Sequence, residues 1–412
     1  MEQALQNGQM TATEEKDLIA LCGDLSKRFA ERAADYDRQA TWPIKDYEDL
    51  KKAGLLGIMV PKEKGGLGAS FLTYTKAQEQ LSSGAASTGL TFNMHNITAG
   101  ILSESKTEDI GGTRGKAMND FRDWALNEIV NGHKMFASAN SEPGIGAHFS
   151  ALKTTYRKVD GGYVINGYKM FVSMLGYADY YVVAARREQS SGDLPEISFF
   201  IVELDNPGIE VEEVWDTMGM RATVSNNMKL KDCFVSQDRL FLGTEGLGIY
   251  KLTREPHWVI GGYVGTYLGL CQATFDYMIS HLQKKKIPGS DQSVINRDWV
   301  QRDVGKLAVQ LEATRELVYK AARLVDEQRG TPQTNAAIHH SKYMVSEFAP
   351  KLASDAIRLC GGSGIARALP LERFYRDARC AGLMPATSDE CLLYAGKSAL
   401  GFDLTHIEET YW

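Results

Sequence analysis

Two short, glycine-containing segments carry the residue types that a flat ligand with polar edges would need. They are residues 141–146 (SEPGIG) and residues 166–173 (NGYKMFVS), and a predicted β-hairpin lies between them. Glycine lets backbone amides come close to a ligand, and a serine hydroxyl both donates and accepts hydrogen bonds. We therefore predict contacts from Ser141, Phe171 and Ser173 to a planar cofactor such as a flavin.

The order and spacing of the two segments resemble the central signature of the acyl-CoA dehydrogenase family, T/S-E-P-x-x-G followed by N-G-x-K-x-W/F-I/V-[ST]. The chain departs from this pattern at Ala147-His148, where the family usually has Ser-Asp. The resemblance implies that Ala147 lies near the substrate. Residues 54–68 (GLLGIMVPKEKGGLG) and 218–225 (MGMRATVS) resemble the family as well, and we expect Arg221 to fix the end of a strand.

A third region of resemblance begins where a predicted helix ends in GGSG and continues as LERFYRDAR. It is similar to the family's Q-x-x-G-G-x-G followed by E-R-x-Y-R-D-A, which implies that Gly361 and Gly362 lie against the FAD of a neighbouring subunit. Arg358 replaces the usual glutamine and could bind a phosphate group. Thr387 is a further candidate contact to the cofactor. The resemblance thus implies FAD and a homo-oligomer, either a dimer or a tetramer. A Rossmann site is not expected, since no strand leads into G-x-G-x-x-G.

The resemblance departs from the family pattern at the catalytic base. Desaturating an acyl thioester requires a positioned carboxylate that removes the α-proton. Most of the family supplies it from Y-E-G-T-[ST], but the glutamate of that motif falls on Pro385 here. One branch of the family supplies the glutamate from the motif E-x5-G-G-x2-G. Residues 255–265 have the same spacing, which makes Glu255 the leading candidate for the base. We expect a helix to begin beside Glu255, because proline follows it at position 256. Alignment through the downstream residues of the same helix instead places Val259 at the base position. The lesser candidates are Asp389, Glu390 and His257.

The elements that must position these residues follow from the periodicity of the apolar side chains. Residues 12 to about 135 read as helices, 136 to about 242 as strands, and 247 onward as long helices with an apolar stripe over 304–325. We predict an α+β fold with three parts. They are an N-terminal helical domain (1–135), a middle β-barrel or sheet domain forming the flavin wall (136–245), and a C-terminal four-helix bundle with cofactor and oligomer contacts (246–412).

Composition excludes several other classes of protein. The net charge is -6 and no basic stripe stands out, so nucleic acid is not an expected partner. No apolar run approaches the ~18 residues of a membrane span, and the polar N-terminus does not read as a signal sequence. Six scattered cysteines suit a reducing, cytoplasmic compartment, and the eight histidines show no metal-ligand spacing.

The resemblance implies an FAD-dependent oxidoreductase that desaturates an acyl thioester, carried by coenzyme A or a carrier protein, and passes electrons to an acceptor such as an electron-transfer flavoprotein. His95 could line the acyl pocket, although a packed helix residue is the alternative. Two other functions remain open. One is a monooxygenase that uses reduced flavin and oxygen, which fits the missing acid at Pro385. The other is a flavin-binding protein without activity.

Overall fold

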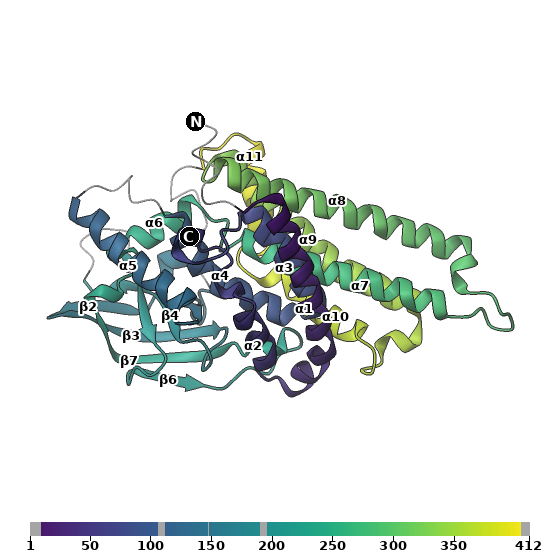
Figure 1. The fold of residues 1–412 in the computed structure, drawn as a ribbon, viewed down its shortest axis with the longest axis horizontal. Helices are drawn as coiled ribbons and strands as arrows, with labels where there is room; N and C mark the ends of the chain where they lie inside the picture. The colour runs from purple at the N-terminus through teal and green to yellow at the C-terminus, as the bar shows by residue number, and fades with distance from the viewer. Residues whose placement is uncertain (1–9, 106–111, 147, 190–195, 405–412) are drawn as a thin grey trace.

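The computed structural model describes residues 10–105, 112–146, 148–189 and 196–404 (Figure 1). Helices form its first third: α1 (Ala12–Gln39), α2 (Ile44–Lys52), α3 (Phe71–Gly84), α4 (Ala86–Glu104) and α5 (Gly112–Val130). Thr11 and Glu14 form a capping box that starts α1, and the helix then buries Leu18, Leu25 and Phe29. Leu21 is exposed instead, and Cys22 is buried in its place.

A seven-stranded sheet follows: β1 (Phe136–Ala139), β2 (Thr155–Val159), β3 (Gly162–Val172), β4 (Tyr180–Arg187), β5 (Ile197–Glu203), β6 (Ile209–Glu212) and β7 (Asn226–Ser236). The strand order is β1-β4-β2-β3-β7-β6, and β5 pairs with β4. Strands β2 and β3 form the predicted hairpin, with Tyr156 opposite Ile165. Strand β4 is buried from Tyr180 to Ala185, as expected where both faces of a sheet are covered.

The rest of the chain is helical: α6 (Leu247–Arg254), α7 (Val264–Lys284), α8 (Asp298–Gln328), α9 (Pro332–Cys360), α10 (Leu371–Arg379) and α11 (Ser388–Ala399). Helix α8 buries one stripe that includes Leu307, Leu311 and Val318, as its apolar spacing predicts. Figure 1 shows α7, α8 and α9 running side by side, with α3 against α7. The predicted fold class, helices followed by a sheet and a helical C-terminal region, is confirmed.

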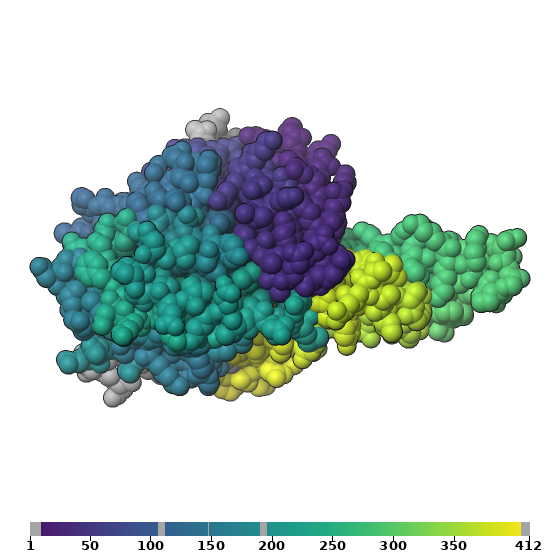
Figure 2. Space-filling view, turned by 90° about the horizontal axis from the view of Figure 1, so that it is seen from below, coloured from purple at the N-terminus to yellow at the C-terminus, as the bar shows by residue number. Residues whose placement is uncertain are grey.

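The end of the bundle where α7 connects to α8 projects from the body of the protein (Figure 2). Helix α8 exposes large apolar side chains, Val309 among them with 71% of its surface accessible, and Trp299 half exposed. Among the helices that the structure describes, none is both long and apolar enough to cross a membrane.

Candidate active site

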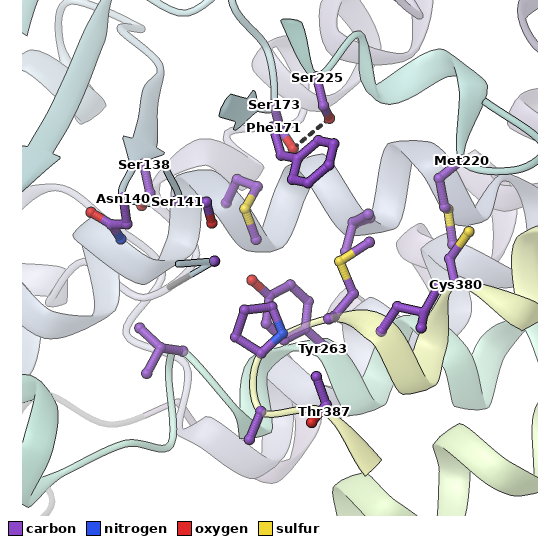
Figure 3. A pocket seen from close by; sticks show the side chains of 18 of the residues that line it. Ser138, Asn140, Ser141, Phe171, Ser173, Met220, Ser225, Tyr263, Cys380 and Thr387 are labelled. Atoms are coloured by element: carbon purple, nitrogen blue, oxygen red, sulfur yellow. Dashed lines mark hydrogen bonds between the residues drawn. The ribbon is translucent and has the colours of Figure 1, made fainter. Parts of the chain in front are cut away.

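A cavity of about 750 Å³ lies between the sheet and the C-terminal helices (Figure 3). Figure 3 shows Phe171, Ser173 and Ser225 on one side of it and Tyr263 and Thr387 on the other. Each neighbouring element contributes to the wall. The lining includes Leu90, Met94 and Ile97 of α4, Ser138 of β1, Asn140, Ser141, Phe171, Ser173, Trp215, Met220 and Ser225 from the sheet region, and Val259, Ile260, Tyr263, Cys380, Met384, Pro385, Thr387 and Glu390 from the helical region.

A buried ion pair joins the two signature segments. Lys169 donates from Nζ to Oε1 of Glu142 at 2.7 Å, and both side chains are essentially inaccessible to water. The same carboxylate accepts hydrogen bonds from the backbone N–H groups of Lys153 and Thr154. Burial alone would raise the pKa of Glu142, but Lys169 and these hydrogen bonds hold it below the usual value. The ion pair therefore fixes the loop at 141–146 beside β3.

Phe171 presents its ring to the cavity because the backbone bends at this residue. Its φ is 56°, an uncommon value for a residue with a side chain, and the pairing of β3 with β7 shifts register between Lys169 and Val172. The side chain is 56% exposed, and Trp215 packs edge-on at 6.0 Å between ring centroids. An exposed ring held in a strained conformation is the flat face that the sequence predicts.

Hydroxyl groups connect the end of β3 to the MGMRATVS segment. The Ser173 and Ser225 hydroxyl oxygens are 2.8 Å apart, and the Thr223 hydroxyl lies 2.7 Å from that of Ser225. Arg221, which the sequence predicts at the end of a strand, lies in a short 3-10 turn (Arg221–Thr223) and donates to the backbone oxygens of Asp37 and Thr217, so it anchors this segment to α1 instead. Three separate stretches of sequence thus form one wall.

The wall also contains an acceptor that suits a flavin. Oδ1 of Asn140 is buried and has no hydrogen-bond partner within the described residues. A buried acceptor without a donor costs roughly 1–3 kcal/mol, so a ligand N–H at this position would be favoured. The ring face, the serine hydroxyls and this amide oxygen together fit an isoalloxazine ring.

The opposite wall bends where α10 gives way to α11. Thr387 and Glu390 form a capping box that starts α11. Beneath the bend, Lys342 of α9 is fully buried and donates from Nζ to the backbone oxygens of Ala381 at 2.7 Å and Met384 at 3.4 Å. Burial lowers the pKa of Lys342 to about 8. This lysine holds the wall segment in place.

Glu390 is the sole carboxylate among the described residues that line the cavity. Its Oε2 accepts a hydrogen bond from the Thr387 backbone N–H at 2.5 Å, and its Oε1 lies 3.7 Å from Nε2 of His148. Pro385 and Val259, two of the three positions where the family resemblance places a base, both line the cavity without an ionisable group. Burial raises the pKa of Cys380 to about 12, so its thiol is a poor proton acceptor at neutral pH.

The structure does not bring Glu255 to the cavity. Helix α6 ends at Arg254, Glu255 is its C-cap, and α7 begins only at Val264. The prediction that a helix begins beside Glu255 is therefore wrong. The reason is Pro256, which stops α6 instead of opening the next helix. Glu255 pairs with Lys251 at 2.6 Å.

Glu255 belongs to a buried charged cluster next to α4. Its carboxylate lies near Glu104 and His257, with the candidate ligand atoms of all three within 4.8 Å of one another. Glu104 accepts from His257 at 2.9 Å and pairs with Arg329 at 3.0 Å. Burial opposes ionisation, yet these partners lower the pKa of Glu104 to about 2. Because Lys251 and Arg329 already supply positive charge to these carboxylates, we interpret the cluster as a structural network and not as a metal site.

The other predicted residues divide between the cavity and the rest of the molecule. Ser141, Phe171, Ser173 and Thr387 line the cavity. His95 does not, because it is fully buried, with Nε2 2.9 Å from the Leu56 oxygen and Nδ1 3.1 Å from the Phe136 nitrogen.

Arg358, Gly361 and Gly362 lie at the end of α9, outside the cavity lining. There Arg358 pairs with Asp303, and Lys285 donates to the Cys360 oxygen. Ala147 falls outside the described residues.

Sequence reasoning missed Asn140 and Trp215. Asn140 directly precedes Ser141, which is a signal that could have identified it. Trp215 reaches the cavity through the folding of a distant segment, and no local pattern marks it.

Comparison with known proteins agrees with this geometry. Models of the acyl-CoA dehydrogenase N-terminal, middle and C-terminal domains match residues 14–110, 137–233 and 261–389. The rat mitochondrial short-chain specific acyl-CoA dehydrogenase is 29% identical over 377 residues, 91% of this chain and 87% of the relative. Among solved structures, butyryl-CoA dehydrogenase from Megasphaera elsdenii has a TM-score of 0.83 and 25% identity, covering 95% of this chain and 99% of the other.

Structures with other described activities share the fold. The nitrososynthase from Micromonospora carbonacea has a TM-score of 0.81 and 26% identity, covering 96% of this chain and 98% of the other. FMN-bound TdsC from Paenibacillus has a TM-score of 0.83 at 22% identity, covering 95% and 99%, a likeness of fold alone. Since the three domain models together match most of its length, in the expected order, the chain belongs to the acyl-CoA dehydrogenase family of flavin-dependent oxidoreductases.

Proposed function

We propose that the protein binds FAD in the cavity and desaturates an acyl thioester at its α,β bond, with Glu390 as the proton acceptor. The observation that carries this proposal is the composition of the cavity. It combines an exposed aromatic face and polar groups on the sheet side with an apolar end and a single carboxylate among its described lining residues. Bound flavin would supply the hydride acceptor.

Each wall has a distinct task in this proposal. Phe171 supports the ring, while Ser141, Ser173 and Asn140 offer hydrogen bonds to its polar edge. Side chains of α4 and Tyr263 form an apolar end that would receive the acyl chain and exclude water from it. The substrate would be a coenzyme A thioester, as in the names of the rat and Megasphaera relatives.

Glu390 is preferred to Glu255 because of where the two carboxylates lie. Glu390 reaches the cavity wall from the first turn of α11 and is held there by the Thr387 N–H. A base that is already oriented needs no reordering before it removes the α-proton. Glu255 would have to leave its ion pair with Lys251 before it could act there.

FAD is preferred to FMN because of the residues at the end of α9. Arg358, Lys285 and the Gly361-Gly362 step combine positive charge with an exposed backbone, which suits a diphosphate and an adenosine. FMN has neither group beyond its single phosphate. These residues lie outside the cavity lining, so a second copy of the chain would supply them.

The electron acceptor would be a partner such as an electron-transfer flavoprotein. A cytoplasmic location is supported by six cysteines without a disulfide.

A second candidate function is a flavin-dependent monooxygenase. The specific observation that favours it is the absence of an acid at both Pro385 and Val259, since a monooxygenase removes no α-proton. The nitrososynthase from Micromonospora carbonacea, which has the same fold and a different named activity, supports a reaction other than desaturation.

The reaction class can be tested by mixing FAD-loaded protein with butyryl-CoA in the absence of oxygen. Desaturation predicts bleaching of the yellow flavin absorbance and a 2-enoyl thioester that mass spectrometry detects as the loss of two hydrogens. A flavin that stays oxidised across acyl-CoA chain lengths would contradict the proposal. Substrate oxidation that requires a flavin reductase and oxygen would then establish the monooxygenase.

A further inference from the structure

A second cavity, of about 590 Å³, lies between the end of α1, the segment at 216–221 and the start of α10. We call it the arginine cavity. It shares Thr217 and Met218 with the first cavity, so the two sites are neighbours. Five guanidinium groups and three carboxylates occur among its described lining residues. They are Arg38, Arg221, Arg367, Arg373 and Arg376, and Asp37, Asp216 and Glu372.

Two of these arginines already have partners. Arg376 makes two hydrogen bonds to Asp37, at 2.9 and 2.6 Å, and two to Glu372, at 2.7 and 3.0 Å. Arg221 pairs with Asp216 at 3.1 Å in addition to its backbone contacts. All three carboxylates of the lining are therefore engaged by Arg376 and Arg221. The other three arginines are left without these acids as partners.

Arg373 is the most unusual of the remaining three. Only 8% of its surface is exposed, and its Nη1 is buried with no hydrogen-bond partner among the described residues. The nearby carboxylate of Asp377 accepts instead from the Met220 backbone N–H at 2.6 Å. Phe374 places its ring centroid 5.4 Å from the guanidinium carbon, which is a weak substitute for an anion. Burial lowers the pKa of Arg373, yet an arginine remains charged at neutral pH.

The carboxylates of Asp377, Asp37 and Glu372 favour the charged form of Arg373, but no acceptor meets its buried Nη1 among the described residues. A buried donor without an acceptor is costly, so its retention needs an explanation. We propose that the arginine cavity binds a small phosphate-bearing anion, held by Arg373 inside and by Arg38 and Arg367 at the surface. Arg367 is exposed, and Arg38 makes only a 3.5 Å contact to Asp35, so both side chains can turn toward a ligand. A planar guanidinium matches two phosphate oxygens at once. This inference is independent of the reaction proposed above.

Phosphate suits the cavity better than a single carboxylate does. The N–H donors of three guanidinium groups outnumber the hydrogen bonds that the two oxygens of one carboxylate can accept. A phosphate or diphosphate has more acceptor oxygens. The cavity volume is in the range of small-molecule sites. Two sources share this chemistry: a separate phosphorylated metabolite, and the diphosphate of FAD, which would then lie here and not at the end of α9 as proposed above.

The test uses inorganic pyrophosphate, titrated calorimetrically at low ionic strength into FAD-loaded and FAD-depleted protein. Binding to both forms would identify a separate ligand site, and binding to the FAD-depleted form alone would assign the cavity to the diphosphate of FAD. Arg373→Met should weaken binding by roughly tenfold or more, since hydrogen bonds to a charged group are lost. Its melting temperature without pyrophosphate should stay close to that of the wild type, because the substitution removes a buried donor without an acceptor together with a charge that lies near Asp377 and Asp37.

Arg367→Gln provides a second test in case Arg373→Met fails to fold. Residue 367 is exposed, so this substitution should weaken pyrophosphate binding without destabilising the protein. Arg157→Gln, at an exposed position on β2, has the same change in net charge and should bind as the wild type does. No binding to either form of the protein would overturn the inference. Equal binding by Arg373→Met, Arg367→Gln and the wild type would overturn it as well.

Discussion

Glu390 takes part in both the cap of α11 and the wall of the cavity. One of its carboxylate oxygens holds the Thr387 N–H, while the other lies 3.7 Å from His148. The cap orients the side chain, and the second oxygen is available to a proton on a substrate carbon. The proposed chemistry therefore depends on a residue that local sequence rules would assign to helix capping alone.

Replacing Glu390 with glutamine tests this dual role. The amide keeps the volume of the side chain and can still accept the Thr387 N–H, so Glu390→Gln should fold and retain flavin. Anaerobic bleaching by butyryl-CoA should slow by about 10²–10⁴-fold, as expected when a general base is lost. Stopped-flow absorbance measures this rate. Glu255→Gln is the matched control and should bleach at the wild-type rate, so the reverse pattern would return the role to Glu255.

At the level of elements, the Glu142–Lys169 pair decides whether the loop at 141–146 and β3 form one wall. Neither charge has access to water, so each depends on the other. By contrast, Lys229 makes partly exposed ion pairs with Glu210 and Glu212 across β6 and β7. The two lysines lie in the same sheet and differ mainly in burial.

Lys169→Met should destabilise the protein by about 3–5 kcal/mol, because it leaves the Glu142 carboxylate buried without a counter-charge. Urea unfolding measures the loss, and the FAD content after gel filtration should fall with it. Adding Glu142→Gln should recover most of the stability. Lys229→Met should change the unfolding midpoint little, and an equally small effect of Lys169→Met would show that the pair does not hold the wall.

These elements also show what a sequence can predict and what it cannot. Ser141, Phe171 and Ser173 belong to motifs whose spacing fixes their place on a strand or loop, and all three line the cavity. Glu255 matches a spacing equally well, but spacing does not reveal on which side of Pro256 the helix lies. No sequence signal marks the unpartnered Nη1 of Arg373, since it depends on Asp377 accepting from the Met220 backbone N–H in another segment.

At the scale of the whole molecule, one end of the bundle projects from the body of the protein. Exposed apolar side chains occur on α8, at Trp299 and Val309, and directly after α9, at Ile365. Gly361 and Gly362 follow α9 close to Ile365 in the chain. A Cβ added at Gly362 would meet no atom of the described residues within 4 Å, so their packing does not explain the absence of a side chain there. A second copy that brings its FAD against this surface would explain it.

Gly362→Leu should therefore fold normally but retain less FAD, with an apparent Kd raised about tenfold by overpacking against the neighbouring cofactor. The FAD-to-protein ratio after gel filtration and the mass from light scattering provide the measurements. Gly396→Leu, at another glycine with open space around it, is the control and should bind FAD normally. A wild-type monomer that holds a full complement of FAD would contradict the shared site.

Lys342 has a consequence for changing the enzyme's preferences. Its buried ammonium group, on α9, donates to the backbone oxygens of Ala381 and Met384 and so holds that wall in place. If the cavity receives an acyl tail as proposed, the length of tail that fits would depend in part on a side chain that the tail does not contact. A mutant library restricted to residues that line the cavity would not include Lys342.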